Sequence, residues 1–434
     1  MPKFHITTLG CKVNQCESAG LAFKLVNSGW QQAQGGQAVD LLVINTCAVT
    51  GKAAMQSRQA VRQAVRENPG ARVVVTGCYA QIDPQALADI DGVAAVMGTG
   101  EKLSIADAPN DDIDDIPTIR CADVMGLEKF DPLPQWGATD RTRPFLKIQD
   151  GCNAHCTYCI VPSARGPSRS LAPDLALAQL RALAQAGFQE TVLTGIHLGC
   201  YGHDLTPPTT LDDLLGQMDH EGAMARVRIS SIEPKELCNA IIDRVTNANC
   251  LCPHIHTPLQ SGDDGVLRKM ARPYTRDFFR DRILTVHRRI PDCAIGVDVL
   301  AGFPGESDAA YENTFGLLED LPITYLHVFP FSSRPGTPAS RMANPVPSDV
   351  IKARCAALRE LGREKRRAFY SAFIGRSARV LVEGSAPLPP GTLRGISDHY
   401  LPVLFSGDGD LKETFVTVRV ERMGPNLELF GTRV

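Results

Sequence analysis

The chain has 434 residues, of which 44% are hydrophobic and 21% are charged, and its formal net charge is −3. These fractions are typical of globular proteins and exclude a disordered or fibrous chain, while the length predicts two to four domains of about 150 residues. The near-neutral charge gives no general affinity for nucleic acid, so an RNA-binding surface would have to be a local patch.

The sequence also predicts a cytoplasmic protein with no membrane partner. No apolar run approaches the roughly 18 residues that a membrane helix needs. Met1–Gly10 lacks the charged segment followed by an apolar one that marks a secretory signal. Because disulfides rarely persist in a reducing compartment, we expect the 14 cysteines to be buried thiols or metal ligands.

Residues 1–113 are predicted to form an N-terminal parallel α/β domain. Short apolar runs alternate there with helical stretches, which is typical of a parallel sheet covered on both faces. Each run leads into a cysteine, and the cysteines follow one another at about the spacing of one βαβ unit. Since open α/β sheets place their ligands at the carboxyl ends of the strands, we expect three thiols at that edge. The runs are Phe4–Leu9, Asp40–Asn45 and Arg72–Thr76, the helices are Glu17–Ser28 and Lys52–Asn68, and the cysteines are Cys11, Cys47 and Cys78.

The middle of the chain is predicted to be a linker followed by a partial barrel. Residues 114–137 are expected to be solvated, because proline and aspartate interrupt the alternation. Residues 138–370 contain six strand candidates, each followed by helical sequence, which predicts a (β/α)6 relative of the eight-stranded barrel. A long basic helix, Asp349–Ile374, follows the last strand. The strand candidates are Pro144–Gln149, Glu190–Ile196, Ala225–Ile232, His254–Leu259, Ala294–Phe303 and Tyr325–Phe331.

The last segment, residues 371–434, is expected to form a small all-β barrel. Four short strands occur there, separated by Gly, Pro and Asp turns, and no helical stretch lies between them. The strands are Arg376–Glu383, Tyr400–Phe405, Thr414–Glu421 and Leu427–Gly431.

A cysteine motif of the form C-x3-C-x2-C, made by Cys152, Cys156 and Cys159, directly follows the first predicted barrel strand. Three thiolates in one short loop can hold three irons of a [4Fe–4S] cluster, and the loop has no fourth cysteine to saturate it. By the logic used for zinc, an open metal position indicates a catalytic site. A zinc site completed by His155 or by a distant ligand is the alternative, although zinc loops more often come as paired C-x2-C elements.

Short motifs also surround the three N-terminal cysteines: LGCKVNQ at residues 9–15, NTCAV at 45–49 and TGCYAQ at 76–81. Together with the cysteine loop, they resemble the radical S-adenosylmethionine superfamily and, within it, the methylthiotransferases, to which the chain is similar from end to end. The resemblance implies that the N-terminal cysteines hold a second [4Fe–4S] cluster and that the C-terminal barrel is a TRAM-like RNA-binding barrel. Three unrelated buried thiols are the alternative for the N-terminal cysteines.

The resemblance implies a division of labour between two clusters that face a common cleft. The loop cluster would bind S-adenosylmethionine and cleave it with one electron from a donor such as flavodoxin or ferredoxin, and the sheet cluster would hold the sulfur. The target carbon has no acidic proton for a general base, so the chemistry is delegated to the cofactors and no catalytic side chain is assigned beyond the cluster ligands. The expected contacts of S-adenosylmethionine are Tyr158, Gly195, Ser231 and Gln260.

The substrate is inferred from the subfamily that the motifs resemble. Residues 9–18, 152–170 and 327–332 are similar to enzymes that act on N6-threonylcarbamoyladenosine at position 37 of tRNA, which implies the anticodon stem-loop, and no DNA, as partner. Isopentenyladenosine at the same position and an aspartate of a ribosomal protein stay open as alternatives. A non-catalytic iron–sulfur protein that binds RNA or carries electrons is a further alternative, although electron carriers usually saturate their irons with thiolates.

A basic stretch before the C-terminal barrel is the expected phosphate-binding surface. An anticodon-loop base can be splayed out of its stack, and a small β-barrel is suited to single-stranded RNA. A solvated helix face is the alternative for the same residues. They are Arg359, Arg363, Lys365, Arg366, Arg367 and Arg376.

Overall fold

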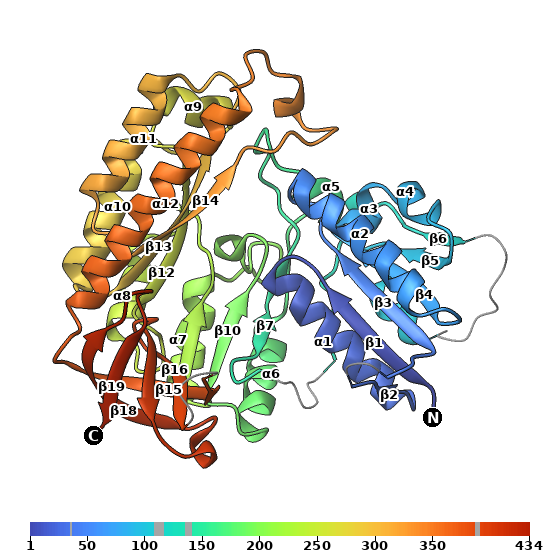
Figure 1. Ribbon diagram of the computed structural model, residues 1–434, viewed down its shortest axis with the longest axis horizontal. Helices are drawn as coiled ribbons and strands as arrows, with labels where there is room; N and C mark the ends of the chain where they lie inside the picture. The colour runs from blue at the N-terminus through green and yellow to red at the C-terminus, as the bar shows by residue number, and fades with distance from the viewer. Residues whose placement is uncertain (35–36, 108–116, 135–140, 387–390) are drawn as a thin grey trace.

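The computed structural model describes residues 1–34, 37–107, 117–134, 141–386 and 391–434. Three main β systems follow one another along the chain: a six-stranded parallel sheet, two three-stranded parallel sheets and a closed five-stranded barrel (Figure 1). This order confirms the predicted fold class, with a parallel α/β part, a partial barrel and a small all-β barrel. Within the described ranges, no helix combines the length and the apolar character needed to cross a lipid bilayer.

The first system is a parallel sheet with the strand order β2-β1-β3-β4-β5-β6. The three predicted strands lie side by side in it as β1, β3 and β4, and every residue of β3 is buried. α1 begins at Lys12 and not at Glu17 as expected, because Cys11 has the extended backbone of an N-cap (φ −95°, ψ 177°). The elements are β1 (Lys3–Thr8), α1 (Lys12–Asn27), β2 (Gln31–Gln32), β3 (Leu41–Thr46), α2 (Gly51–Glu67), β4 (Arg72–Gly77), α3 (Cys78–Ile82), α4 (Gln85–Ala88), β5 (Val93–Met97) and β6 (Thr118–Arg120).

Part of the segment expected to be a linker belongs to this sheet. Thr118–Arg120 form β6, which pairs with β5, and Val124 and Leu133 are buried. Most of the other described side chains in this segment are exposed or half-buried, as a solvated connection predicts. Residues 114–116 and 135–137 of the expected linker lie outside the described residues.

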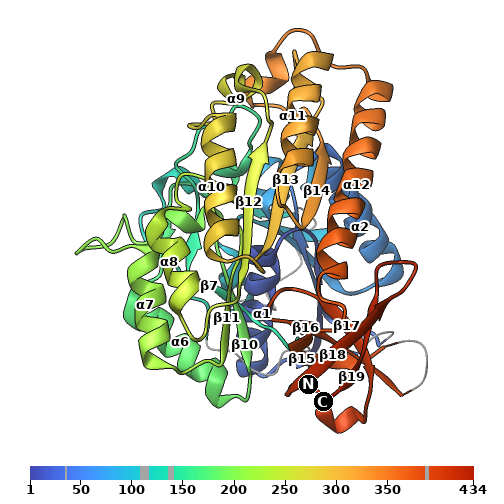
Figure 2. The same cartoon turned by 90° about the vertical axis from the view of Figure 1, so that its left-hand side faces the viewer.

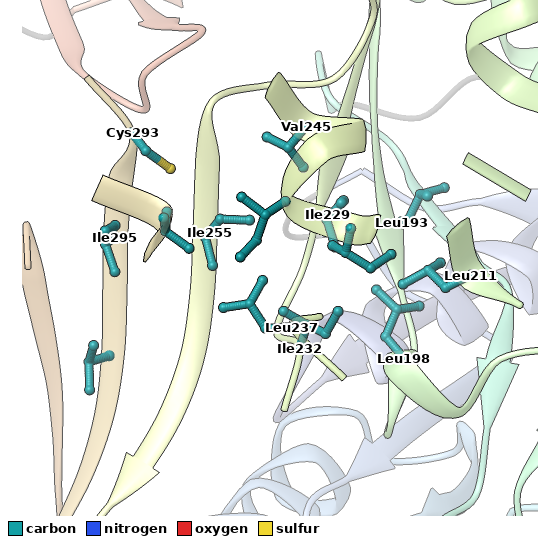
Figure 3. Close-up of a cluster of buried hydrophobic side chains, with 14 of the residues drawn as sticks. Leu193, Leu198, Leu211, Ile229, Ile232, Leu237, Val245, Ile255, Cys293 and Ile295 are labelled. Atoms are coloured by element: carbon teal, nitrogen blue, oxygen red, sulfur yellow. The ribbon is translucent and has the colours of Figure 1, made fainter. Parts of the chain in front are cut away.

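The second system contains all six predicted barrel strands, in two sheets of three, β7-β10-β11 and β12-β13-β14. Isolated bridges next to β11 and β12 connect the two sheets. β7 and β14 lie at the outer edges of this arrangement, so the barrel is open between them. Leu193, Ile229, Ile255 and Ile295 from neighbouring strands pack into one core with side chains of the surrounding helices (Figure 3).

The helices of the barrel lie on its outer side (Figure 2); helical sequence was expected after each strand, but the bounds of α7 were not predicted. α7 begins with a capping box made by Thr210 and Asp213. The elements are β7 (Phe145–Lys147), β8 (Gln149–Asp150), α5 (Val161–Arg165), β9 (Arg169–Ser170), α6 (Pro173–Gln185), β10 (Glu190–Thr194), α7 (Leu211–Glu221), β11 (Arg226–Ile229), α8 (Asn239–Asn247), β12 (His254–Gln260), α9 (Asp264–Lys269), α10 (Arg276–Arg289), β13 (Ala294–Ala301), α11 (Asp308–Asp320), β14 (Tyr325–Pro330) and α12 (Ser348–Ser371).

The third system is a closed barrel with the strand order β15-β16-β17-β19-β18. Four of its strands correspond to the predicted ones, and β16 was not predicted. α12 runs along β14 toward this barrel (Figure 2), and Tyr370 and Phe373 at its end pack into the barrel core. The strands are β15 (Ser377–Ser385), β16 (Thr392–Ser397), β17 (Pro402–Ser406), β18 (Phe415–Met423) and β19 (Leu429–Arg433).

Two buried arginines of β11 attach the closed barrel to the open one. The Arg226 guanidinium donates to Asp398 Oδ1 at 2.6 Å and to the Ile396 carbonyl at 3.0 Å. Arg228 donates to the carbonyl of Asp398 at 3.1 Å. Both arginines also pair with Glu190 of β10, so each cation is neutralised where it is buried.

Candidate active site

Cys11, Cys47 and Cys78, here called the sheet-edge triplet, follow the carboxyl ends of the adjacent strands β1, β3 and β4. The structure thus brings the three predicted thiols to one edge. Cys11 is exposed, whereas Cys47 and Cys78 are buried. Burial, together with the neighbouring Cys78 and Cys11, raises the pKa of the Cys47 thiol to about 11. A metal that binds here must therefore displace thiol protons.

Two glycines allow this edge to be compact. Gly10 has a φ of +101°, and a Cβ on it would lie 2.9 Å from Cys47 Cβ. Gly77 has a φ of +99°, and a Cβ on it would lie 2.4 Å from Asn45 Oδ1 and 2.5 Å from the Thr46 carbonyl oxygen. Because other residues rarely adopt this conformation, the glycine before each of Cys11 and Cys78 is required by the local packing.

Cys152, Cys156 and Cys159, here called the loop triplet, lie between β8 and α5. The Cys152 N–H donates to the Gly166 carbonyl at 3.0 Å, and the Cys159 N–H donates to the Cys156 carbonyl at 3.0 Å. Burial, together with the neighbouring Cys156 and Cys152, raises the pKa of Cys159 to about 12. All 14 cysteines are free thiols, so both triplets can serve as metal ligands.

The spacing of the thiols distinguishes a cluster from a single zinc ion. With Zn–S bonds of about 2.3 Å, zinc gathers its ligand atoms within about 4 Å of one another. Among the described residues, ligand atoms within 4.8 Å of one another form two groups of three, and neither includes a triplet cysteine or His155. The thiols of neither triplet are therefore gathered as a single zinc ion would gather them, which is compatible with a larger group such as a [4Fe–4S] cluster. The two groups are His197, Cys200 and Glu236, and His256, Asp298 and His327.

Polar side chains that the sequence analysis missed contact the loop triplet. Arg272 donates to Cys156 Sγ at 3.3 Å and is itself paired with Glu233. His197 Nδ1 lies 3.5 Å from Cys152 Sγ. His197 lies two residues after Gly195, which was expected to contact S-adenosylmethionine, whereas no local pattern marks Arg272.

Three of the four expected S-adenosylmethionine contacts lie at the carboxyl ends of neighbouring strands. Gly195 follows β10, Ser231 follows β11, and Gln260 ends β12 with a φ of +64°. A Cβ on Gly195 would lie 2.8 Å from Gln149 Oε1. The fourth, Tyr158, lies between Cys156 and Cys159 and packs against an apolar cluster that includes Val266 and Met270.

Asn14, in the first turns of α1, connects the sheet-edge triplet to the barrel. Its Nδ2 donates to the Leu9 carbonyl at 2.8 Å and to the Thr46 carbonyl at 2.9 Å. These carbonyls lie at the ends of β1 and β3, just before Cys11 and Cys47. Its Oδ1 accepts from Arg165 of α5 at 2.7 Å and lies 4.0 Å from Cys78 Sγ. The sequence motif contains Asn14, but its spacing gave no indication of this role.

A buried ion-pair network continues from Arg165 to the loop triplet. Arg165 donates to Glu17 of α1 at 2.8 Å and to Asp150 at 2.9 Å, and Asp150 also accepts from the Gly151 N–H at 2.8 Å. Although burial raises the pKa of Glu17, Arg165, Lys102 and Lys147 hold it well below its usual range. The chain of contacts from Asn14 through Arg165 and Asp150, here called the inter-triplet network, therefore links the two candidate cluster sites. That both triplets face one cleft stays a prediction.

The residues expected to bind RNA divide into two groups. Arg359, Arg363 and Arg367 are exposed on α12, where Arg363 pairs with Glu360 and Arg359 donates to the Val328 carbonyl at 3.5 Å. Lys365 donates to the Leu321 carbonyl at 2.9 Å, and Arg376 pairs with Asp292 at 3.0 Å, so both have partners within the protein. The sixth residue, Arg366, lies over the Tyr325 ring at 5.8 Å.

Comparisons with known proteins give consistent matches. Residues 3–98 match the model of the uncharacterized protein family UPF0004, and residues 146–318 match that of the Radical SAM superfamily. The chain is 36% identical, over 97% of its length and 94% of the relative's, to threonylcarbamoyladenosine tRNA methylthiotransferase MtaB of Bacillus subtilis. It is 34% identical, over 98% and 90%, to tRNA-2-methylthio-N(6)-dimethylallyladenosine synthase of Thermus thermophilus. Its fold is similar to that of the radical S-adenosylmethionine methyltransferase TsrM from Kitasatospora setae, with a TM-score of 0.58, 15% identity and coverage of 78% and 77%.

Proposed function

Because this chain belongs to the radical S-adenosylmethionine methylthiotransferase family, we propose that it adds a methylthio group to C2 of N6-threonylcarbamoyladenosine at position 37 of tRNA. The observation that carries the proposal is the pair of three-cysteine sites joined by the inter-triplet network. Relatives from Bacillus subtilis and Aquifex aeolicus, both 36% identical, are named for threonylcarbamoyladenosine. The relative from Thermus thermophilus, named for dimethylallyladenosine, makes that nucleoside the second candidate.

The two triplets would each hold a [4Fe–4S] cluster, and the one at the loop triplet would bind S-adenosylmethionine. When bound, these cofactors supply the one-electron chemistry and the sulfur that insertion at an unactivated aromatic carbon needs. The chain itself holds and orients them. Arg272 donates to the thiolate ligand Cys156, which stabilises its anionic form, and Tyr158, Gly195, Ser231 and Gln260 are the contacts proposed for S-adenosylmethionine.

The division of the chain that goes with this function has four parts. Residues 1–113 form the domain that carries the sheet-edge triplet, and residues 114–137 connect it to the radical core. Residues 138–370 form this radical core, and residues 371–434 form the RNA-binding barrel. The partner is the anticodon stem-loop of a tRNA, which the C-terminal closed barrel and α12 bind. The reductant is a protein such as flavodoxin or ferredoxin, and the compartment is the cytoplasm.

The experiment that tests this function uses anaerobically reconstituted protein with S-adenosylmethionine, a strong reductant and tRNA. We expect 5′-deoxyadenosine and methylthio-threonylcarbamoyladenosine by mass spectrometry. Cys156→Ala should abolish both products, whereas Cys47→Ala should abolish only the methylthio nucleoside. Cys238→Ala, at an exposed cysteine outside both triplets, is the control and should form both.

Three results would overturn the assignment. If no 5′-deoxyadenosine forms, the chain is a non-catalytic iron–sulfur protein and not a radical enzyme. Conversion of tRNA that carries dimethylallyladenosine, with none of the threonylcarbamoyl form, would establish the second candidate. Methylthiolation of a ribosomal-protein aspartate, with no tRNA product, would move the substrate to protein.

A further inference from the structure

A cavity of about 390 Å³ lies where the three β systems meet, at the open side of the barrel. Lys12 lines it from α1, Phe145 from β7, Tyr325 from β14, and Tyr400 from the turn between β16 and β17. Small-ligand pockets typically measure about 300–1,000 Å³. Lys12 directly follows Cys11, so the cavity lies beside the sheet-edge triplet.

One wall of this cavity is made of aromatic rings. The ring of Tyr400 lies 4.5 Å from that of His254 and 6.0 Å from that of Tyr325, between centroids. The rings of His256 and Tyr325 are 6.0 Å apart and inclined by only 21°. Tyr400 has a φ of +62°, a conformation that is uncommon for a bulky residue and that clusters at binding sites. Such a wall can stack against a purine base.

The same cavity carries positive charge, most of which already has partners. Arg143 donates to Glu383 at 2.7 and 2.9 Å, and Arg228 donates to Glu190 at 3.0 Å. Asp298, behind the wall, lies within hydrogen-bond distance of two imidazoles, at 2.9 and 3.1 Å. These are His256 and His327.

Lys12 is the exception among these cations. Within the part of the chain that the structure describes, its ammonium group has no hydrogen-bond or ion-pair partner. Lys12 is exposed where it lines this aromatic cavity, so its ammonium group can meet an anionic substituent of a ligand that the aromatic wall holds.

We propose that this cavity holds the target adenosine with its base against the aromatic wall and the carboxylate of its threonylcarbamoyl group on Lys12. The inference rests on the proposed function and adds the basis of its substrate selectivity. An apolar dimethylallyl group offers no anion to Lys12, so the charge-assisted contact that only the carboxylate can make favours the threonylcarbamoyl group. Lys12 is thus a specificity-determining residue, and its anion is a carboxylate of the nucleoside, not a phosphate of the RNA.

Binding experiments with three anticodon stem-loops of one sequence separate these sources of negative charge. The stem-loops carry threonylcarbamoyladenosine, its methyl ester or unmodified adenosine, so that phosphates are identical and only the first has the carboxylate. Anisotropy is measured anaerobically with full-length reconstituted protein and without S-adenosylmethionine, so the readout does not depend on turnover. Lys12→Met should weaken binding of the first stem-loop about ten- to a hundredfold and leave the methyl ester unchanged.

Two further variants and the iron content make the result decisive. Lys12→Arg should restore selectivity for the carboxylate, and Lys24→Met, on the same helix but paired with Asp107 at 2.7 Å, should change nothing. Iron content equal to wild type shows that Cys11 still serves its cluster. Equal losses for all three stem-loops would assign Lys12 to a phosphate, and no loss, or a wild type that does not prefer the carboxylate, would also overturn the proposal. A wild type that binds selectively but forms no methylthio nucleoside would contradict the proposed function and leave this subsite standing.

Discussion

Gly77 shows how closely one residue can control a candidate metal site. Replacement by alanine forces a Cβ into a position 2.4 Å from Asn45 Oδ1, at a φ of +99°. We expect Gly77→Ala to displace Cys78 and to lower the iron content of reconstituted protein from about eight toward about four per chain, since one of two four-iron clusters is lost. Iron analysis and the yield of methylthio nucleoside measure the effect.

Gly70→Ala is the matched control. Gly70 also has a positive φ, +92°, but an added Cβ would have no heavy atom within 4 Å. It carries the backbone cost of about 1 kcal/mol without the steric conflict, so its iron content should equal that of wild type. Iron loss in both variants would attribute the effect to general destabilisation, and full iron in Gly77→Ala would show that the sheet edge tolerates the shift.

At the residue scale, the sequence could place the candidate ligands at one edge and missed the side chains that surround them. Cys11, Cys47 and Cys78 could be placed at one edge because each ends a strand and parallel strands have a fixed polarity. Asn14 and Arg165 form one hydrogen bond although they are 151 residues apart. No periodicity or local motif encodes such a contact, since it depends on how α1 packs against α5 in three dimensions.

Among the elements, α12 is the one on which RNA binding can be tested. Arg359, Arg363 and Arg367 are exposed on it, and replacement of all three by glutamine should weaken tRNA binding. Because each phosphate contact contributes about 0.7–0.9 to the slope of log K against log salt, that slope should become shallower by up to about 2 to 3. Filter binding across a salt series measures it.

The same loss of charge on a different helix provides the comparison. Arg280, Arg288 and Arg289 of α10 lie away from α12, with α11 between the two helices (Figure 2). Glutamine at these three positions should leave the salt slope unchanged. Equal slopes for both triple variants would favour the solvated-face interpretation of α12.

The contact of β10 and β11 with the closed barrel predicts that the free energy of unfolding depends on pH. Glu190 is fully buried, and although burial raises its pKa, Arg228, Arg226 and Arg143 hold the pKa below its ordinary value. A lowered pKa stabilises the fold fully above the ordinary value near 4.5, and this contribution is lost as the pH falls through the folded-state pKa.

Glu190→Gln leaves buried arginines uncompensated and should lower the free energy of unfolding at neutral pH by about 3–5 kcal/mol. Urea unfolding at several pH values should show the gap between wild type and variant shrinking as the pH falls below the ordinary pKa. Glu221→Gln breaks the exposed pair with Arg181 and should cost at most about 1 kcal/mol at every pH. If the difference in unfolding free energy between wild type and Glu190→Gln does not change with pH, the charge of Glu190 is not the cause of that difference.

At the element scale, strands with continuous apolar runs were predicted and weaker patterns were missed. The six barrel strands, some of which alternate polar and apolar residues, were predicted as short runs that are each followed by helical sequence. β16 was not predicted because Gly395 interrupts its apolar pattern. A Cβ at this position would lie 2.4 Å from the Leu381 carbonyl oxygen, so the close packing of the barrel, and not strand propensity, requires glycine here. α7 had a local signal, the capping box of Thr210 and Asp213, which the sequence analysis did not use.

Across the whole molecule, the two triplets belong to separate β systems, so their relative position depends on the contacts between these systems. Arg165 is only 1% exposed, and its guanidinium contacts Glu17 and Asn14 on the N-terminal side and Asp150 on the barrel side. Reaction between groups held at two sites is sensitive to displacements of about 1 Å. The network should therefore matter more for transfer between the sites than for either site alone.

Arg165→Lys tests this, since lysine keeps the charge that compensates Glu17 and Asp150 but cannot reproduce the planar, multidentate contact that includes Asn14. We expect wild-type iron content and continued formation of 5′-deoxyadenosine, while the yield of methylthio nucleoside per 5′-deoxyadenosine falls at least about tenfold. Arg354→Lys is the control, because Arg354 is also buried but pairs with Glu306 and Asp308, outside the network; any loss there should affect both products in parallel. An unchanged product ratio in Arg165→Lys would show that the two sites keep their relative position without this network.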